Sequence, residues 1–143
     1  MKKKTKGSRL WSRILATQAM YQLSLNEDSD VSFIIKNLLK KKETKNIPDT
    51  RFFSRLLNET IKNKKKLDDI LIDTLTKKRF LKMETIIRVI LELGVCEIIY
   101  FKNLSHKISI AEYNKVSSSF LNDKEVGLIN AILDKISKKL ING

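Results

Sequence analysis

Apolar residues recur every three to four positions along most of the chain, which is the spacing of helices that bury one face. Only four glycines and one proline interrupt the sequence, and so few chain breakers favour long helices over many short strands. The pattern predicts an all-α fold, a compact bundle of about seven helices that could pack as two smaller bundles. The predicted helices cover about 8–25, 31–39, 50–64, 67–77, 82–101, 109–119 and 122–140.

The predicted helix over 82–101 is the most hydrophobic one. Apolar residues occupy nearly every side of it, so we expect other helices to surround it. Its most apolar stretch, 86–101, still contains Arg88, Glu92 and Glu97, and it is too short to cross a bilayer comfortably. The sequence therefore predicts a buried helix and no membrane association.

Two helix starts have the sequence of a capping box, in which a polar cap residue is followed three positions later by Glu or Gln. Ser109 with Glu112 predicts the start of the sixth helix, and Asn122 with Glu125 predicts the start of the last one. At the other end of the chain, residues 1–8 read as a flexible basic arm. Residues 9–143 then form a single all-helical domain, since no linker divides them and their length fits one domain.

The charge of the chain is strongly positive. Lysine and arginine outnumber aspartate and glutamate by 29 to 16, which gives a net charge of +13. This excess favours a polyanionic partner such as nucleic acid, because each neutralised phosphate releases condensed counterions. The alternative is a compositional habit, since lysine, asparagine and isoleucine are abundant throughout.

Candidate chemistry for catalysis is sparse. The only histidine, His106, lies in a basic loop and reads as a surface residue, and the only cysteine, Cys96, reads as a small core residue. The glycines do not cluster into a phosphate-binding loop. The sequence thus predicts a protein that is not an enzyme and has no cofactor or metal. A single thiol and the lack of a signal-peptide pattern predict a cytoplasmic location.

Three segments together resemble the NusB family. The first is 9–21, an arginine-containing stretch that leads into Gln-Ala-Met-Tyr, and the second is 52–57, with the aromatic and leucine pattern of the family's third helix. The third and most specific is 108–135. It contains Ile-Ala-Glu at 110–112 and Ile-Asn-Ala-Ile-Leu-Asp-Lys at 129–135, which is similar to the family's C-terminal motif. The resemblance covers almost the whole chain in matching order.

This resemblance implies a fold of two packed helical bundles and a role in transcription antitermination. Family members bind the boxA segment of ribosomal RNA leaders together with ribosomal protein NusE. The complex joins RNA polymerase and helps it read through terminators in ribosomal RNA operons. Family members differ in whether two copies pair, so a homodimer stays open here.

The residue types near the N-terminus agree with single-stranded RNA as a partner, which needs cations for phosphates and flat faces for unstacked bases. Tyr21 is the expected stacking face on the first helix. Lys124 stands where the family commonly has an aspartate beside the RNA path, and a lysine there should favour phosphate binding. The remaining predicted RNA-binding residues are cations: Lys2, Lys3, Lys4, Lys6, Arg9 and Arg13.

The sequence departs from the family pattern around the expected NusE contact. The family's Glu-Arg-Ala-Ile-Leu-Arg becomes Ile-Arg-Val-Ile-Leu-Glu at 87–92, Cys96 replaces a tyrosine, and Thr74 stands where a second aromatic is common. The predicted partner-binding residues are Ile87, Arg88 and Glu92.

Two other functions keep the predicted fold. The same helical domain also occurs ahead of RNA methyltransferase domains as an RNA-targeting module, but this sequence ends at Gly143, directly after its last helix, so we expect a stand-alone factor. Alternatively, the basic face meets an acidic protein, which predicts no affinity for RNA.

Overall fold

The computed structural model describes residues 7–40 and 47–142, and these contain eight α-helices and no β-strand. The predicted all-α class is confirmed, with one helix more than expected. The helices are α1 (Ser8–Leu25), α2 (Val31–Lys40), α3 (Thr50–Lys62), α4 (Lys64–Leu75), α5 (Lys77–Lys82), α6 (Thr85–Tyr100), α7 (His106–Ser118) and α8 (Asp123–Asn142).

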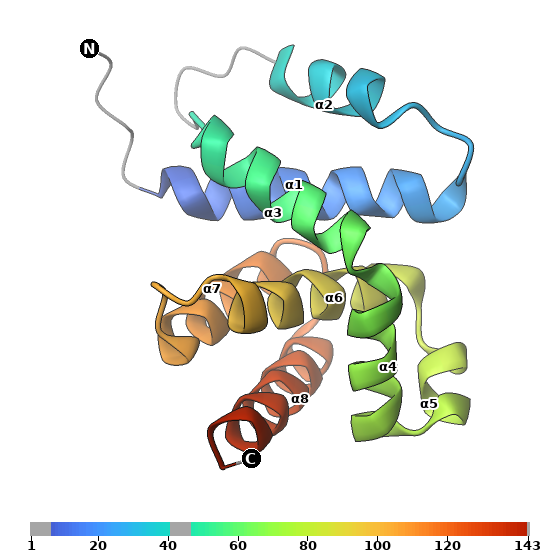
Figure 1. The fold of residues 1–143 in the computed structure, drawn as a ribbon, viewed down its shortest axis with the longest axis vertical. Helices are drawn as coiled ribbons and strands as arrows, with labels where there is room; N and C mark the ends of the chain where they lie inside the picture. Colours follow the sequence, from blue (N-terminus) through green and yellow to red (C-terminus); the bar gives the residue numbers. More distant parts are fainter. Residues whose placement is uncertain (1–6, 41–46, 143) are drawn as a thin grey trace.

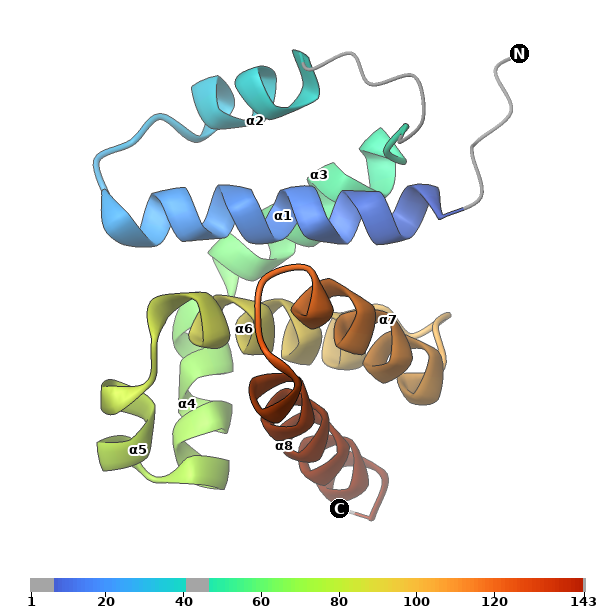
Figure 2. The ribbon, with the colours of Figure 1, turned by 180° about the vertical axis from the view of Figure 1, so that it is seen from behind.

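The helices form two groups that meet across α6. Figures 1 and 2 show α1, α2 and α3 on one side and α4 to α8 on the other. Helix α6 contacts α1 and α3 from the first group and α4, α7 and α8 from the second. As the hydrophobic pattern predicts, the most apolar helix is the central one, and ten of its residues from Val89 to Ile98 are buried in succession.

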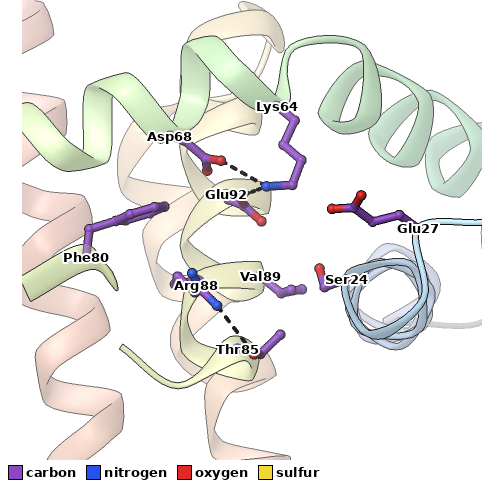
Figure 3. Close-up of a pocket in the computed structure, with 9 residues that line it drawn as sticks. All are labelled: Ser24, Glu27, Lys64, Asp68, Phe80, Thr85, Arg88, Val89 and Glu92. Atoms are coloured by element: carbon purple, nitrogen blue, oxygen red, sulfur yellow. Dashed lines mark hydrogen bonds and ion pairs between the residues drawn. The ribbon is translucent and has the colours of Figure 1, made fainter. Parts of the chain in front are cut away.

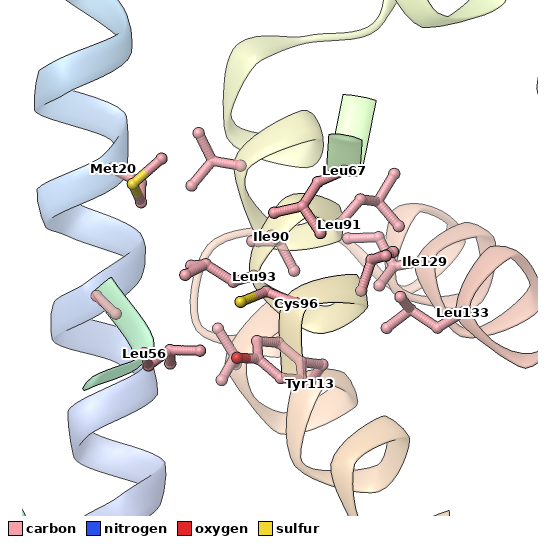
Figure 4. Close-up of a cluster of buried hydrophobic side chains, with 14 of the residues drawn as sticks. Met20, Leu56, Leu67, Ile90, Leu91, Leu93, Cys96, Tyr113, Ile129 and Leu133 are labelled. Carbon is pink, nitrogen blue, oxygen red and sulfur yellow. The ribbon is translucent and has the colours of Figure 1, made fainter. Parts of the chain in front are cut away.

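Side chains from both groups build one core around α6 (Figure 4). Helix α8 approaches α6 closely at Gly94. A Cβ atom added to Gly94 would lie 2.9 Å from Cδ1 and 3.0 Å from Cδ2 of Leu133, which is itself fully buried. The lack of a side chain at Gly94 therefore sets how closely α6 and α8 pack.

Cys96 lies in this core, facing α3. Burial raises the pKa of its thiol to about 11, while a hydrogen bond with Thr60 acts in the opposite direction. The thiol therefore stays protonated near neutral pH, which agrees with its prediction as a core residue.

The predicted fifth helix is wrong in one respect, because 82–101 is not continuous. Met83 and Glu84 have extended backbone angles, and they separate the short helix α5 from α6. The predictions left 78–81 outside any helix, so α5 is the helix that they missed, and α6 begins three residues after the predicted start. A helix of six residues is too short for its apolar positions to show a helical repeat.

Thr76 makes the turn between α4 and α5 with a positive φ of 98°, which is unfavourable for a β-branched residue. Its hydroxyl accepts a hydrogen bond from the backbone N–H of Arg79 at 3.3 Å and thereby caps α5. Such a backbone conformation costs about 1–3 kcal/mol, so the surrounding packing must hold it in place.

Of the two predicted capping boxes, one is confirmed and one is wrong. Asn122 and Glu125 bond reciprocally, each side chain accepting from the other's backbone N–H, at 2.9 and 3.2 Å. Helix α7, in contrast, begins at His106 with Ser105 as its cap, whose hydroxyl accepts from Ile108 N–H at 3.2 Å. The predicted cap, Ser109, is a buried residue of the first turns of α7.

In the described part of the chain, no helix is both long and apolar enough to span a membrane.

Candidate nucleic-acid interface

Arg9 lies at the start of α1 and keeps about half of its side chain exposed, at 51%. Its guanidinium carbon lies 4.9 Å from the centre of the Phe52 ring, and Nε is 3.8 Å from Oδ2 of Asp49. The aromatic face and the carboxylate orient Arg9, while the exposed part of the fork can still meet a phosphate.

The starts of α1 and α3 are fastened to each other beside Arg9. The buried hydroxyl of Ser12 lies 2.9 Å from the backbone oxygens of both Ser8 and Asp49. Asp49 in turn caps α3, because its carboxylate accepts from the backbone N–H of Phe52 at 3.1 Å. The first turn of α1 therefore presents Arg9 from a fixed platform.

The prediction that Arg13 binds RNA is wrong, because its side chain is buried whereas that of Arg9 is half exposed. Only 2% of the Arg13 side chain is exposed, and its guanidinium forms a bidentate ion pair with Glu97, in which Nε donates to Oε2 at 2.9 Å and Nη2 donates to Oε1. Ser109 donates to the same carboxylate at 2.9 Å. Arg13 thus connects α1 with α6 and α7, and it cannot reach a phosphate in this arrangement.

The ionisation of Arg13 is fixed by this pair. Burial alone would lower the pKa of the guanidinium, but the hydrogen bonds and negative charge of Glu97 outweigh it and raise the pKa further. The ring of Phe52 lies 4.8 Å and the ring of Tyr113 5.9 Å from the guanidinium carbon. The cation is enclosed by aromatic faces and one carboxylate, which is the surrounding that makes a buried charge tolerable.

Tyr21 lies at the opposite end of α1 from Arg9, about 18 Å further along the helix axis, with 37% of its side chain exposed. It lines a groove of about 480 Å³ that also involves residues from α2, α6 and the turn before α8. The other lining residues are Gln18, Gln22, Leu38, Ile86 and Phe120. A half-exposed phenol next to a second aromatic and two amides can hold a flat, hydrogen-bonding group such as a base.

Sequence reasoning did not predict Gln18, Gln22 or Ile86 for this site. Gln18 lies three positions before Tyr21 and four before Gln22, so it shares a face of α1 with each of them. The spacing is a usable signal for the two glutamines. No local pattern reveals that Ile86 and Phe120 come to the same groove.

Lys124 is exposed in the first turn of α8, two positions after the Asn122 cap. No ion pair engages it within the described residues, while Asp123 and Glu125 on either side offset its charge at the positive end of the helix dipole. Its exposure leaves it available, and its role in phosphate binding stays a prediction. Lys2, Lys3, Lys4 and Lys6 lie outside the described residues.

Two of the three predicted partner-binding residues are not accessible. Ile87 and Glu92 are buried, with 5% and 2% exposure, so they cannot form a surface for another protein. Arg88 keeps a partly exposed side chain, which lies 5.6 Å from the centre of the Phe80 ring. Helices from both groups pack around α6, and of these three side chains they leave only Arg88 partly exposed.

Glu92 and Arg88 line a polar pocket of about 170 Å³ between α1, α4, α5 and α6 (Figure 3). Lys64 reaches in from α4 and donates to Asp68 at 2.9 Å and to Glu92 at 3.1 Å. Burial raises the pKa of Glu92 to about 8, and the nearby Asp68 carboxylate adds to this, whereas Lys64 lowers it. The pocket is therefore an internal charge cluster rather than a partner surface.

We expect Glu92→Gln to reduce the dependence of stability on pH. Because the pKa of Glu92 is raised from 4.5 to about 8, the folded state binds its proton more tightly than the unfolded chain does. The stabilisation from this proton is complete below about pH 4.5 and is lost as the pH rises through about 8. In urea titrations at several pH values, the wild type should lose more stability than the variant over this range. Parallel curves for the two proteins would contradict the assignment.

The comparisons with known proteins agree with this architecture. The sequence model of the NusB family matches residues 11–138. A transcription antitermination protein NusB of Rickettsia massiliae is 31% identical over 140 residues, covering 90% of each chain, and that of Rickettsia typhi is 30% identical over 138 residues with the same coverage. Among solved structures, NusB of T. maritima has a TM-score of 0.80 at 22% identity, covering 95% of this chain and 93% of that one. A structure of antitermination factors NusB and NusE in complex with double-stranded RNA has a TM-score of 0.80 at 20% identity, covering 92% and 97%. The chain belongs to the NusB family.

Proposed function

We propose that this protein is a non-enzymatic transcription antitermination factor of the cytoplasm. It binds boxA RNA of ribosomal RNA operons together with ribosomal protein NusE and promotes read-through by RNA polymerase. Family membership supports this role, as do the names of the relatives and the solved complex of NusB with NusE and RNA.

The observation that carries the proposal is the groove at Tyr21 on the same helix that presents Arg9. An RNA strand running along α1 would meet a guanidinium for its phosphates at one end and aromatic side chains, Tyr21 and Phe120, at the other. Single-stranded RNA is bound through this combination of cations and stacking faces. Arg88 is the one predicted NusE contact that stays accessible, so we retain it as the candidate on that side.

The test is a titration of the full chain, with and without NusE, against boxA RNA and a scrambled RNA of equal length. We expect tighter binding to boxA and a further gain with NusE. Equal, salt-sensitive binding to both RNAs without any effect of NusE would contradict the proposal. Binding of an acidic protein with no affinity for either RNA would favour the protein-interaction alternative.

Tyr21→Ala should weaken boxA binding by at least about fivefold, because stacking of one base on an aromatic ring contributes about 1–3 kcal/mol. Phe33→Ala is the matched control, since Phe33 is an exposed aromatic of α2 that does not line the groove. Filter binding or fluorescence anisotropy would measure both. An equal loss for the two variants would remove Tyr21 from the site.

A further inference from the structure

Helix α5 concentrates positive charge that the fold does not use. Four of its six residues are exposed cations, Lys77, Lys78, Arg79 and Lys82. Within the described residues, none of these side chains forms an ion pair or a hydrogen bond. Asp73 is the last acidic residue before α5 in the sequence, and it pairs with Lys139 of α8 instead, with its Oδ2 atom 3.7 Å from Nζ of the lysine.

Some other cations of the protein do have structural partners. Arg55, for example, donates to the backbone oxygen of Tyr100 at 3.1 Å and lies 4.0 Å from the centre of the Phe101 ring. It therefore caps α6 and packs on its end. In α5 the only buried residue is Phe80, which anchors the helix, so the four cations could change without loss of packing.

The position of α5 places its last residue, Lys82, near the groove at Tyr21. Lys82 precedes Ile86, which lines that groove, by four residues, so their backbones lie at most about 14 Å apart. This span corresponds to about four nucleotides, at a spacing of about 3.4 Å per nucleotide along one stacked strand. Figure 2 shows α5 and the start of α6 on the side of the molecule where α1 ends.

We propose that α5 is a second phosphate-binding surface, which holds the RNA strand beyond the segment bound at Arg9 and Tyr21. The inference rests on the proposed function and extends it. The side chains supply point charges and one guanidinium fork, and no flat face accompanies them, so this surface binds the RNA backbone without reading its sequence. The exposed Leu81 is a single apolar residue and offers no larger apolar patch to a protein partner.

The test combines a charge variant with RNA length. The variant replaces Lys77, Lys78, Arg79 and Lys82 with Gln, which has a helix propensity close to that of Lys and Arg. The control variant removes the same charge from four exposed lysines elsewhere, Lys36, Lys102, Lys107 and Lys135. Each full-length protein is titrated at several salt concentrations with a short boxA RNA and with the same RNA extended by a few nucleotides on both sides. Circular dichroism confirms that each variant is folded.

For the wild type and the control, the longer RNA should bind more tightly than the short one. The slope of the logarithm of the binding constant against the logarithm of the salt concentration should also become steeper, by about 0.7 for each added phosphate contact. The α5 variant should lose this gain, with a slope lower by about 1.4–2.8 for two to four contacts. Equal losses in the two charge variants would overturn the proposal, because net charge alone would explain them. The proposal would also be overturned if the longer RNA still bound the α5 variant more tightly than the short RNA, by as much as for the wild type. If that variant then failed to bind a polyglutamate peptide that the wild type binds, α5 would instead be assigned to contact with an acidic protein. Preference for boxA over the scrambled short RNA tests the proposed function separately.

Discussion

Replacing Arg13 with methionine is expected to lower the free energy of unfolding by about 3–5 kcal/mol, because the change leaves Glu97 buried without its ion-pair partner. The carboxylate would keep the hydrogen bond from Ser109 but no cationic partner among the described residues, in a site with no exposure to water. Urea or thermal unfolding followed by circular dichroism measures the loss.

Arg9→Met is the matched control for this experiment. Arg9 is half exposed, so its loss should change stability by less than about 1 kcal/mol. A double variant, Arg13→Met with Glu97→Leu, should recover part of the stability, because replacing both members of a buried pair removes the unpaired charge. A loss for Arg13→Met no larger than that for Arg9→Met would contradict the buried pair.

The same two variants separate structure from RNA binding. Arg9→Met should lower the salt slope of RNA binding by about 0.7, the value for one phosphate contact. Arg13→Met, measured under conditions in which it is folded, should leave the slope unchanged, since the side chain faces Glu97 and not the solvent.

Gly94→Ala is expected to destabilise the protein by about 1–3 kcal/mol, the usual effect of overpacking a core. The new methyl group would meet both terminal carbons of Leu133 at 3.0 Å or less. Leu133 is fully buried, so it cannot turn away into solvent, and α6 and α8 would have to separate. The midpoint of urea unfolding measures the effect.

Gly127→Ala provides the opposite control in the same protein. Gly127 lies in α8 with nothing within 4 Å of the position of an added Cβ, so the alanine should raise stability by up to about 1 kcal/mol. Combining Gly94→Ala with Leu133→Ala should remove the steric conflict. If Gly94→Ala is as stabilising as Gly127→Ala, the close approach of the two helices is wrong.

Much of the fold could be predicted from the sequence, because the apolar residues that a helix buries recur at a regular spacing along the chain. The bounds of α1 and the reciprocal cap at Asn122 and Glu125 depend on neighbouring residues, and both are as predicted. Helix α5 was missed, since its six residues hold only two apolar positions, Phe80 and Leu81, and these show no helical repeat.

The candidate site was predictable only in part, because accessibility depends on contacts distant in the sequence. Arg9 and Arg13 are one turn apart and look equivalent, but Glu97, 84 positions beyond Arg13, determines that only Arg9 is exposed. Ile87 and Glu92 are buried because helices from both groups cover α6. The family resemblance pointed to residues on particular helices, and the packing of those helices decides which of these residues remain available.

The single thiol of Cys96 makes the protein a reporter of its own internal motion. Because the sulfur is enclosed and stays protonated, a thiol reagent can react only when the contacts between α3 and α6 open. The labelling rate therefore measures how often the two helical groups part, with no probe to introduce and no second cysteine to complicate the signal. A ligand that bridges the groups should slow this labelling in proportion to how strongly it favours the closed state.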